Sequence, residues 1–237
     1  MAIIEYELDQ GVAILFMNDG ENRFNLNFLN AFLKVLDGIE QDTDAHALVV
    51  TASHEKIFSN GIDLDWLLPI LQEQDKETAA LFFHTLNRLF KRLLLYPMVT
   101  VAAISGHAFA GGAILSCAFD FRFMRSDRGF FCFPEVDLGI PFLPGMIALI
   151  RKAIPPYKME ELHLTGKRIT AEECEAHHIV VKACHRQDLM KEALAFAREP
   201  KKRRSVLAEM KRRMHSAVVH AIEVEDPPVI DSGVFYV

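Results

Sequence analysis

MVTVAAISGHAFAGGAILSCAFDFRFMRSDRGFFCFPEVDLGIPFLPG, residues 98–145, is the stretch of the chain that decides the fold. It begins with an apolar run, Met98 to Ile104, which predicts a buried strand. The run breaks at Ser105-Gly106, and small residues then lead into an apolar segment from Ala113 that predicts a buried helix. A strand, a glycine turn and a helix N-terminus in this order direct backbone N–H groups toward an anion.

The same stretch contains a carboxylate in apolar surroundings. About two dozen residues after Gly111-Gly112, Glu135 follows Pro134 and lies close to Phe133 and Ile140 in the chain. Apolar neighbours raise the pKa of a carboxyl group if they pack around it. Backbone donors for an anion, followed by such a carboxyl group, predict a site that forms and discharges an enolate.

Composition places the chain among folded proteins that bind neither nucleic acid nor membranes. Of its 237 residues 51% are hydrophobic and 24% are charged, and the formal net charge is -6. No run approaches the roughly 18 apolar residues of a spanning helix, and the first eight residues carry two glutamates and no apolar signal region. The ending Val234-Phe-Tyr-Val differs from a peroxisomal Ser-Lys-Leu tail. We therefore expect a cytoplasmic protein.

Periodicity along the chain predicts strand, strand, helix, repeated about three times, then helices only. This order favours an α/β fold built from stacked ββα units. We expect strands at 3–8, 12–17, 47–51, 98–104, 119–124, 129–133 and 179–181. We expect helices at 26–41, 77–95, 113–117, 145–153, 157–164, 187–198 and about 200–221, with a short capped helix after Thr170 and an irregular tail from Asp226.

Two clusters of polar residues have a simple and a functional interpretation. The thiols and imidazoles between Cys174 and His185 are numerous enough for zinc, but a strand at 179–181 would turn them to opposite faces, so we expect no metal site. The basic groups 201–204 and 211–213 favour a solvated or subunit-facing helix side over a phosphate contact.

Several motifs together resemble the crotonase (enoyl-CoA hydratase/isomerase) superfamily. The segments Ser105–Leu115, Cys117–Asp120 and Pro134–Gly139 resemble its central signature. Glu21–Asn25, Phe58–Leu64 and Leu164–Glu173 resemble further family segments in the right order. The resemblance implies a crotonase-like ββα spiral core over residues 1–197, which contains the acyl-CoA site. Residues 198–237 then form a C-terminal helix and tail, an oligomerisation region in a homotrimer or hexamer.

The resemblance also implies the site. Acyl-CoA thioesters are the substrates of the family, with coenzyme A as part of the substrate and no separate cofactor. The two backbone N–H groups of the oxyanion hole fall on Ile62 and Gly111. The catalytic carboxylate of the family falls on Glu135. Substrate or coenzyme A contacts fall on Arg23, Asn60, Gly61, Asp63, Leu64, Gly112 and Ile114.

The reaction depends on position 114. Hydratases that the chain resembles have one glutamate there and one at the position of Glu135, but this chain has Ile114. Adding water suits two carboxylates, whereas moving a double bond needs one base that takes a proton from C2 and returns it at C4. We therefore expect an enoyl-CoA Δ3,Δ2-isomerase of fatty-acid metabolism. Leu143 stands where dienoyl-CoA isomerases have an aspartate, which argues against that activity.

Two alternatives remain open at this point. The first is an enoyl-CoA hydratase or another acyl-CoA lyase or hydrolase of the same family. The second is an acyl-CoA-binding subunit without turnover. A carboxyl group in an apolar loop, such as that of Glu135, is however costly to keep in a protein that only binds. Phe82, Phe83 and Phe109 are candidates for the lining of an acyl channel.

Overall fold

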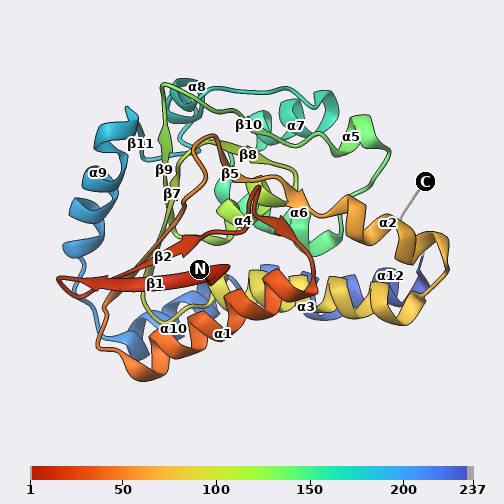
Figure 1. Ribbon diagram of the computed structural model, residues 1–237, viewed down its shortest axis with the longest axis horizontal. Coiled ribbons are helices and arrows are strands. Elements are labelled where there is room, and N and C mark those ends of the chain that lie inside the picture. The colour runs from red at the N-terminus through yellow and green to blue at the C-terminus, as the bar shows by residue number, and fades with distance from the viewer. Residues whose placement is uncertain (1, 234–237) are drawn as a thin grey trace.

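A computed structural model describes residues 2–233 of the chain. Figure 1 shows a central sheet with helices on both of its sides. The sheet has six strands in the order β1-β2-β4-β7-β9-β11, where β1 and β2 form an antiparallel hairpin and the other neighbours are parallel. The strands are β1 (Ile4–Asp9), β2 (Val12–Met17), β4 (Ala47–Ala52), β7 (Val99–Ile104), β9 (Phe121–Arg125) and β11 (Lys182–Cys184).

The central sheet separates two apolar cores. Along β4, Leu48 and Val50 belong to the larger core, whereas Ala47 and Val49 belong to the smaller one, as the two-residue period of a strand requires. The larger core holds the apolar faces of α1 (Leu26–Asp42) and α3 (Lys76–Leu94). The smaller core lies under α9 (Arg186–Arg198). The expected helices at 26–41, 77–95 and 187–198 are confirmed.

Two small parallel sheets stand beside the central sheet and position the loops of the site. One has the order β10-β8-β5, with β5 (Ile57–Ser59), β8 (His107–Phe109) and β10 (Phe131–Cys132). The other pairs β3 (Arg23–Phe24) with β6 (Gly61–Ile62). The remaining helices of the core are α2 (Leu64–Gln72), α4 (Gly111–Ala118), α5 (Glu135–Leu138), α6 (Pro144–Ala153), α7 (Pro156–Thr165) and α8 (Ala171–Ala176).

The segment after Cys174 differs slightly from expectation. Thr170 and Glu173 form the expected capping box, so the helix start is confirmed. The strand expected at 179–181 is instead a turn, and β11 follows it at Lys182–Cys184. Within residues 2–233 no three His, Cys, Asp or Glu side chains are close enough to hold a metal ion.

The C-terminal region is where the sequence prediction was wrong. One helix over 200–221 is replaced by α10 (Arg204–Met214) and α11 (Ser216–His220), and a π-helical turn, η1 (Ala221–Glu225), leads into α12 (Asp226–Ser232). The tail expected to be irregular from Asp226 is helical to Ser232, because Pro227 and Pro228 lie in the first turn, where no N–H is needed. The tail beyond Gly233 lies outside the described residues.

Two members of the basic groups are bound to the core: Lys211 is buried, and Arg204 is half-buried. Lys211 is paired with Asp120 at 2.6 Å and donates to the Met98 carbonyl, and Arg204 donates to carbonyl groups at the end of α1. Their charges therefore anchor α10 to the core. None of the helices described in residues 2–233 has the length and apolar character needed to cross a bilayer.

Candidate active site

Strand β6 and the N-terminus of α4 lie in very close contact. A Cβ atom added to Gly61 would lie 2.4 Å from the backbone nitrogen of Gly111, and one added to Gly111 would lie 3.1 Å from the Gly61 Cα atom. Gly61 also has a φ of +77°, a conformation that side chains disfavour. Glycine at both positions is what lets the two backbone segments approach.

The approach brings two backbone donors to one place. The Asp63 nitrogen donates to the Phe24 carbonyl, and because N–H groups alternate along an extended strand, the Ile62 N–H points away from β3. Gly111 is the first residue of α4, and the first N–H groups of a helix have no acceptor within it. Ile62 and Gly111 line the same cavity, which fits the oxyanion hole expected from the sequence.

The turn before α4 is held in an unusual backbone conformation. Ala110 has φ 48° and ψ −126°, a region in which residues other than glycine are strained. Gly112 is packed so closely that a Cβ atom there would lie 2.2 Å from the Ser59 carbonyl oxygen. The turn is thus fixed by β5, and with it the direction of the Gly111 N–H.

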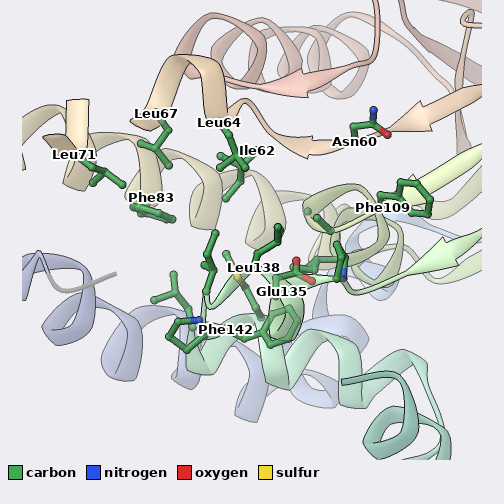
Figure 2. A pocket seen from close by; sticks show the side chains of 18 of the residues that line it. Asn60, Ile62, Leu64, Leu67, Leu71, Phe83, Phe109, Glu135, Leu138 and Phe142 are labelled. Carbon is green, nitrogen blue, oxygen red and sulfur yellow. The ribbon is translucent and has the colours of Figure 1, made fainter. Parts of the chain in front are cut away.

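An apolar cavity of about 260 Å³ opens in front of these donors. Figure 2 shows Ile62 and Leu64 on one side of it, with Glu135, Leu138 and Phe142 across from them. Its described lining holds one carboxyl group and otherwise few polar side chains. The lining residues are Asn60, Ile62, Leu64, Leu67, Leu71, Phe83, Phe109, Ala110, Gly111, Ile114, Pro134, Glu135, Leu138, Ile140, Pro141, Phe142, Leu143, Met146 and Val229.

Glu135 is the first residue of the short helix α5 and is buried. Its Oε2 atom has no hydrogen-bond partner within the described residues. Burial raises the pKa of Glu135 to about 7, against a weaker lowering from a backbone hydrogen bond. The rise expected from the apolar neighbours is confirmed. A carboxyl group with a pKa near 7 can accept and return a proton at neutral pH.

Position 114 contributes no second carboxylate. Ile114 lies in the first turn of α4, is buried and lines the cavity together with Glu135. Among the lining residues that the structure describes, Glu135 is the only acidic one. The cavity therefore offers two backbone donors and a single proton acceptor.

The other residues expected to bind substrate divide into two groups. Asn60 and Leu64 line the cavity, whereas Gly61 and Gly112 lie behind it and shape the backbone. Arg23 and Asp63 lie instead in a separate groove together with Asp19, Glu21, Asn25 and Asp65.

Arg23 is already neutralised in that groove. It pairs with Glu21 at 2.6 Å and with Asp65 at 2.7 Å, and the hydrogen bond that it donates to Glu21 is the main cause of its raised pKa. Asp63 is the residue before α2, but its side chain makes no capping hydrogen bond. A phosphate contact by Arg23 stays a prediction, and it would require Arg23 to leave at least one carboxylate.

Sequence reasoning missed the far part of the cavity. Phe83 and Phe109 line it as anticipated, but Phe82 does not, since it packs against Trp66 in the core. Leu64 at the start of α2 was anticipated, but Leu67 and Leu71 of the same helix, Met146 of α6 and Val229 of α12 were not. For α2 the helical spacing of Leu64, Leu67 and Leu71 is a usable signal.

Comparison with known proteins identifies the family of the chain. The model of a family described as enoyl-CoA hydratase/isomerase matches residues 7–226. The chain is 36% identical over 172 residues to the peroxisomal enoyl-CoA delta isomerase 2 of Arabidopsis thaliana. The aligned region covers 70% of each of the two proteins. It is 34% identical over 193 residues to a putative enoyl-CoA hydratase of Thermus thermophilus, which covers 79% of this chain and 74% of that protein.

Solved structures agree in fold. An enoyl-CoA hydratase/isomerase family protein from Pseudomonas syringae superimposes with a TM-score of 0.88 at 24% identity and covers 98% of both chains. A probable enoyl-CoA hydratase from Mycobacterium tuberculosis gives a TM-score of 0.87 at 23% identity, over 98% of this chain and 96% of that one. The fold expected from the motifs is confirmed.

Proposed function

Because this chain belongs to the enoyl-CoA hydratase/isomerase family, we propose that it is an enoyl-CoA Δ3,Δ2-isomerase. The observation that carries the proposal is the cavity with one carboxyl group, Glu135, and with Ile114 beside it. A proton shuttle needs one group that is first a base and then an acid, whereas water addition is better served by two.

The proposed reaction moves the double bond of a 3-enoyl-CoA to the 2-trans position. The thioester oxygen accepts hydrogen bonds from the Ile62 and Gly111 N–H groups. The Glu135 carboxylate removes a proton from C2, and the electron pair of that C–H bond forms the C1–C2 double bond of a dienolate as the carbonyl pair moves onto the thioester oxygen; the C3–C4 double bond is retained. The oxyanion then re-forms the carbonyl, the C1–C2 pair becomes the C2–C3 double bond, and the C3–C4 pair takes the proton that Glu135 delivers to C4.

The reaction balances without a further reagent. The proton that leaves C2 returns at C4, and no electrons enter or leave the substrate. The proposal therefore includes no cofactor besides the coenzyme A of the substrate. The pKa of Glu135, near 7, supports both steps, because a stronger acid would be a poor base and a weaker one would return the proton slowly.

The test is the Glu135→Gln variant assayed with 3-enoyl-CoA thioesters. Glutamine keeps the size of the side chain but cannot accept the proton, so kcat should fall by about 100- to 10,000-fold. For the wild type, kcat/KM should rise with pH through about 7, where the carboxylate forms, and then level off. Product formation is followed by chromatography of the enoyl-CoA isomers.

Other outcomes would select the alternatives. Unchanged turnover in Glu135→Gln would reject Glu135 as the shuttle. Faster hydration of crotonyl-CoA than isomerisation would indicate a hydratase, and tight acyl-CoA binding without any product would indicate a binding subunit.

We also propose that the protein assembles as a homotrimer or hexamer through α10. Val206, Met210 and Met214 recur every four residues on this helix and are 50%, 52% and 68% exposed. Apolar side chains at this spacing form one face, and such a face favours burial against a partner. Light scattering should give a mass three or six times that of the chain, and a monomer at micromolar concentration would contradict the assembly.

A further inference from the structure

Helix α12 forms part of the wall of the cavity that contains Glu135. Val229 lines this cavity together with Leu71 of α2 and Phe83 of α3. Figure 2 shows Leu71 and Phe83 at the end of the cavity away from Phe109. The family model ends at Asp226, so Val229 lies beyond the matched part of the chain. The wall of the cavity thus includes one residue, Val229, from a segment that the family match does not cover.

A buried carboxylate fixes α12 in this place. Asp226 is fully buried, accepts a hydrogen bond from the Gly145 nitrogen of α6 at 2.7 Å, and accepts another from Asn87 of α3 at 2.8 Å. A hydrogen bond between His84 and Asp231 also joins α3 to α12, and an ion pair between Lys91 and Glu223 joins α3 to the preceding η1. Figure 1 shows α12 running beside α3. Val229 is therefore held by its own chain rather than by a neighbouring subunit.

The size of the cavity sets how much of an acyl chain it can cover. Apolar cavities of about 150 Å³ hold a six-carbon ring, so a cavity of about 260 Å³ corresponds to roughly ten carbon atoms. Val229 is 37% exposed, so part of its side chain meets solvent. Carbon atoms beyond Val229 would stay in water and add no affinity.

We propose that Val229 marks the outer limit of the acyl-binding cavity and makes the site select acyl groups of about ten carbons. The proposal rests on the proposed function for its substrate class, acyl-CoA thioesters. Each methylene that enters the cavity should strengthen binding about fourfold. The gain in affinity should end where the acyl chain extends past Val229.

The experiment is a binding series with saturated acyl-CoA thioesters of four to fourteen carbons, measured by calorimetry. Wild-type affinity should rise to about ten carbons and then stay level. Val229→Asp places a charge at the outer end, so binding of decanoyl-CoA should weaken about tenfold or more, while butanoyl-CoA should lose less than twofold. Val224→Asp is the matched control, because Val224 is exposed on η1 and lies outside the lining.

The outcomes separate this proposal from the isomerase activity. An affinity that rises without a break to fourteen carbons, or a Val229→Asp loss that is equal at all lengths, would overturn the role of Val229. A wild type that shows the break but isomerises no 3-enoyl-CoA would leave that role standing and reject the isomerase. Binding of no acyl-CoA at any length would reject both.

Discussion

At its N-terminus, helix α4 faces a cavity that contains one carboxyl group, whereas its C-terminus meets the side chains of Lys152 and Arg122. Both ends have ionisable groups withdrawn from water, and burial shifts the pKa of Glu135 up and that of Lys152 down, each to about 7. Burial disfavours the charged form in both cases. The two groups differ in their partners.

At the C-terminus the side-chain donors meet backbone carbonyl oxygens. The Lys152 Nζ atom donates to the carbonyl oxygens of Phe119 at 2.6 Å, Cys117 at 3.1 Å and Ala118 at 3.4 Å. Arg122 donates to the carbonyls of Ser116, Phe119 and Ile179. Apart from the Ile179 carbonyl, these acceptors are the last carbonyl groups of α4 and of the turn after it, which would otherwise lack donors. The buried charges here hold the helix in place.

At the N-terminus the Oε2 atom of Glu135 has no partner in the described part of the chain. An unpaired buried polar atom costs stability, and structures keep such atoms where a ligand or a reaction uses them. The comparison therefore assigns opposite roles to two ionisable groups that lie near opposite ends of α4. One serves the fold, and the other serves the proposed chemistry at a cost to the fold.

The largest expected effect comes from moving the backbone donors without touching a charged group. Gly61→Ala would force a methyl group against the Gly111 nitrogen, 2.4 Å away, and so separate the Ile62 and Gly111 N–H groups. Because the dienolate depends on both donors, kcat for 3-enoyl-CoA isomerisation should fall about 1,000-fold.

Gly20→Ala is the matched control for this variant. Gly20 also has a positive φ, +51°, but a Cβ atom there would meet nothing within 4 Å. It should carry the same kind of backbone strain, about 1 kcal/mol, with unchanged kcat. Equal loss of activity in both variants would show that strain, rather than the donor geometry, causes the effect.

The sequence predicted the backbone part of the site well, because that part is local. A buried strand, the small residues around Gly111 and the start of α4 follow one another in the chain, and each element has its own pattern. Ile62 was identified through the resemblance to a known family, and Glu135 through that resemblance together with its apolar neighbours in the chain. The catalytic role of Glu135 itself stays a prediction that its burial and raised pKa support.

The outer cavity and the partnered charges could not be predicted in the same way. Pro227 and Pro228 suggested an irregular tail, although they fit a first helical turn, so the contribution of Val229 was hidden. Lys211 stands in a basic run that looks solvated. Its burial depends on Asp120, which lies 91 positions earlier and meets it only in the folded chain. Long-range partners of this kind leave no local pattern.

The smallest expected effects test the comparison directly, since neutralising the two groups should change stability by different amounts. Glu135→Gln should stabilise the protein at pH 8 by up to about 3 kcal/mol, because a carboxyl group with a pKa near 7 when folded and about 4.5 when unfolded opposes folding once ionised. Lys152→Met should leave stability nearly unchanged: it removes the cost of an ammonium group whose pKa burial lowers to about 7, but it also takes a donor from the Cys117 and Ala118 carbonyls, which costs about 2 kcal/mol. Urea unfolding followed by circular dichroism measures both.

The sign of the pH dependence separates the two charges further. Between pH 4.5 and 7 the folded wild type binds more protons at Glu135 than the unfolded chain does, so its stability should fall as the pH rises through this window. The gain in Glu135→Gln should therefore vanish near pH 4. Lys152→Met should retain wild-type kcat, since Lys152 touches only the far end of α4. If Lys152→Met instead stabilised the protein, its three carbonyl contacts would not offset the cost of burying the ammonium group, and the two ends of α4 would be alike in carrying a costly charge.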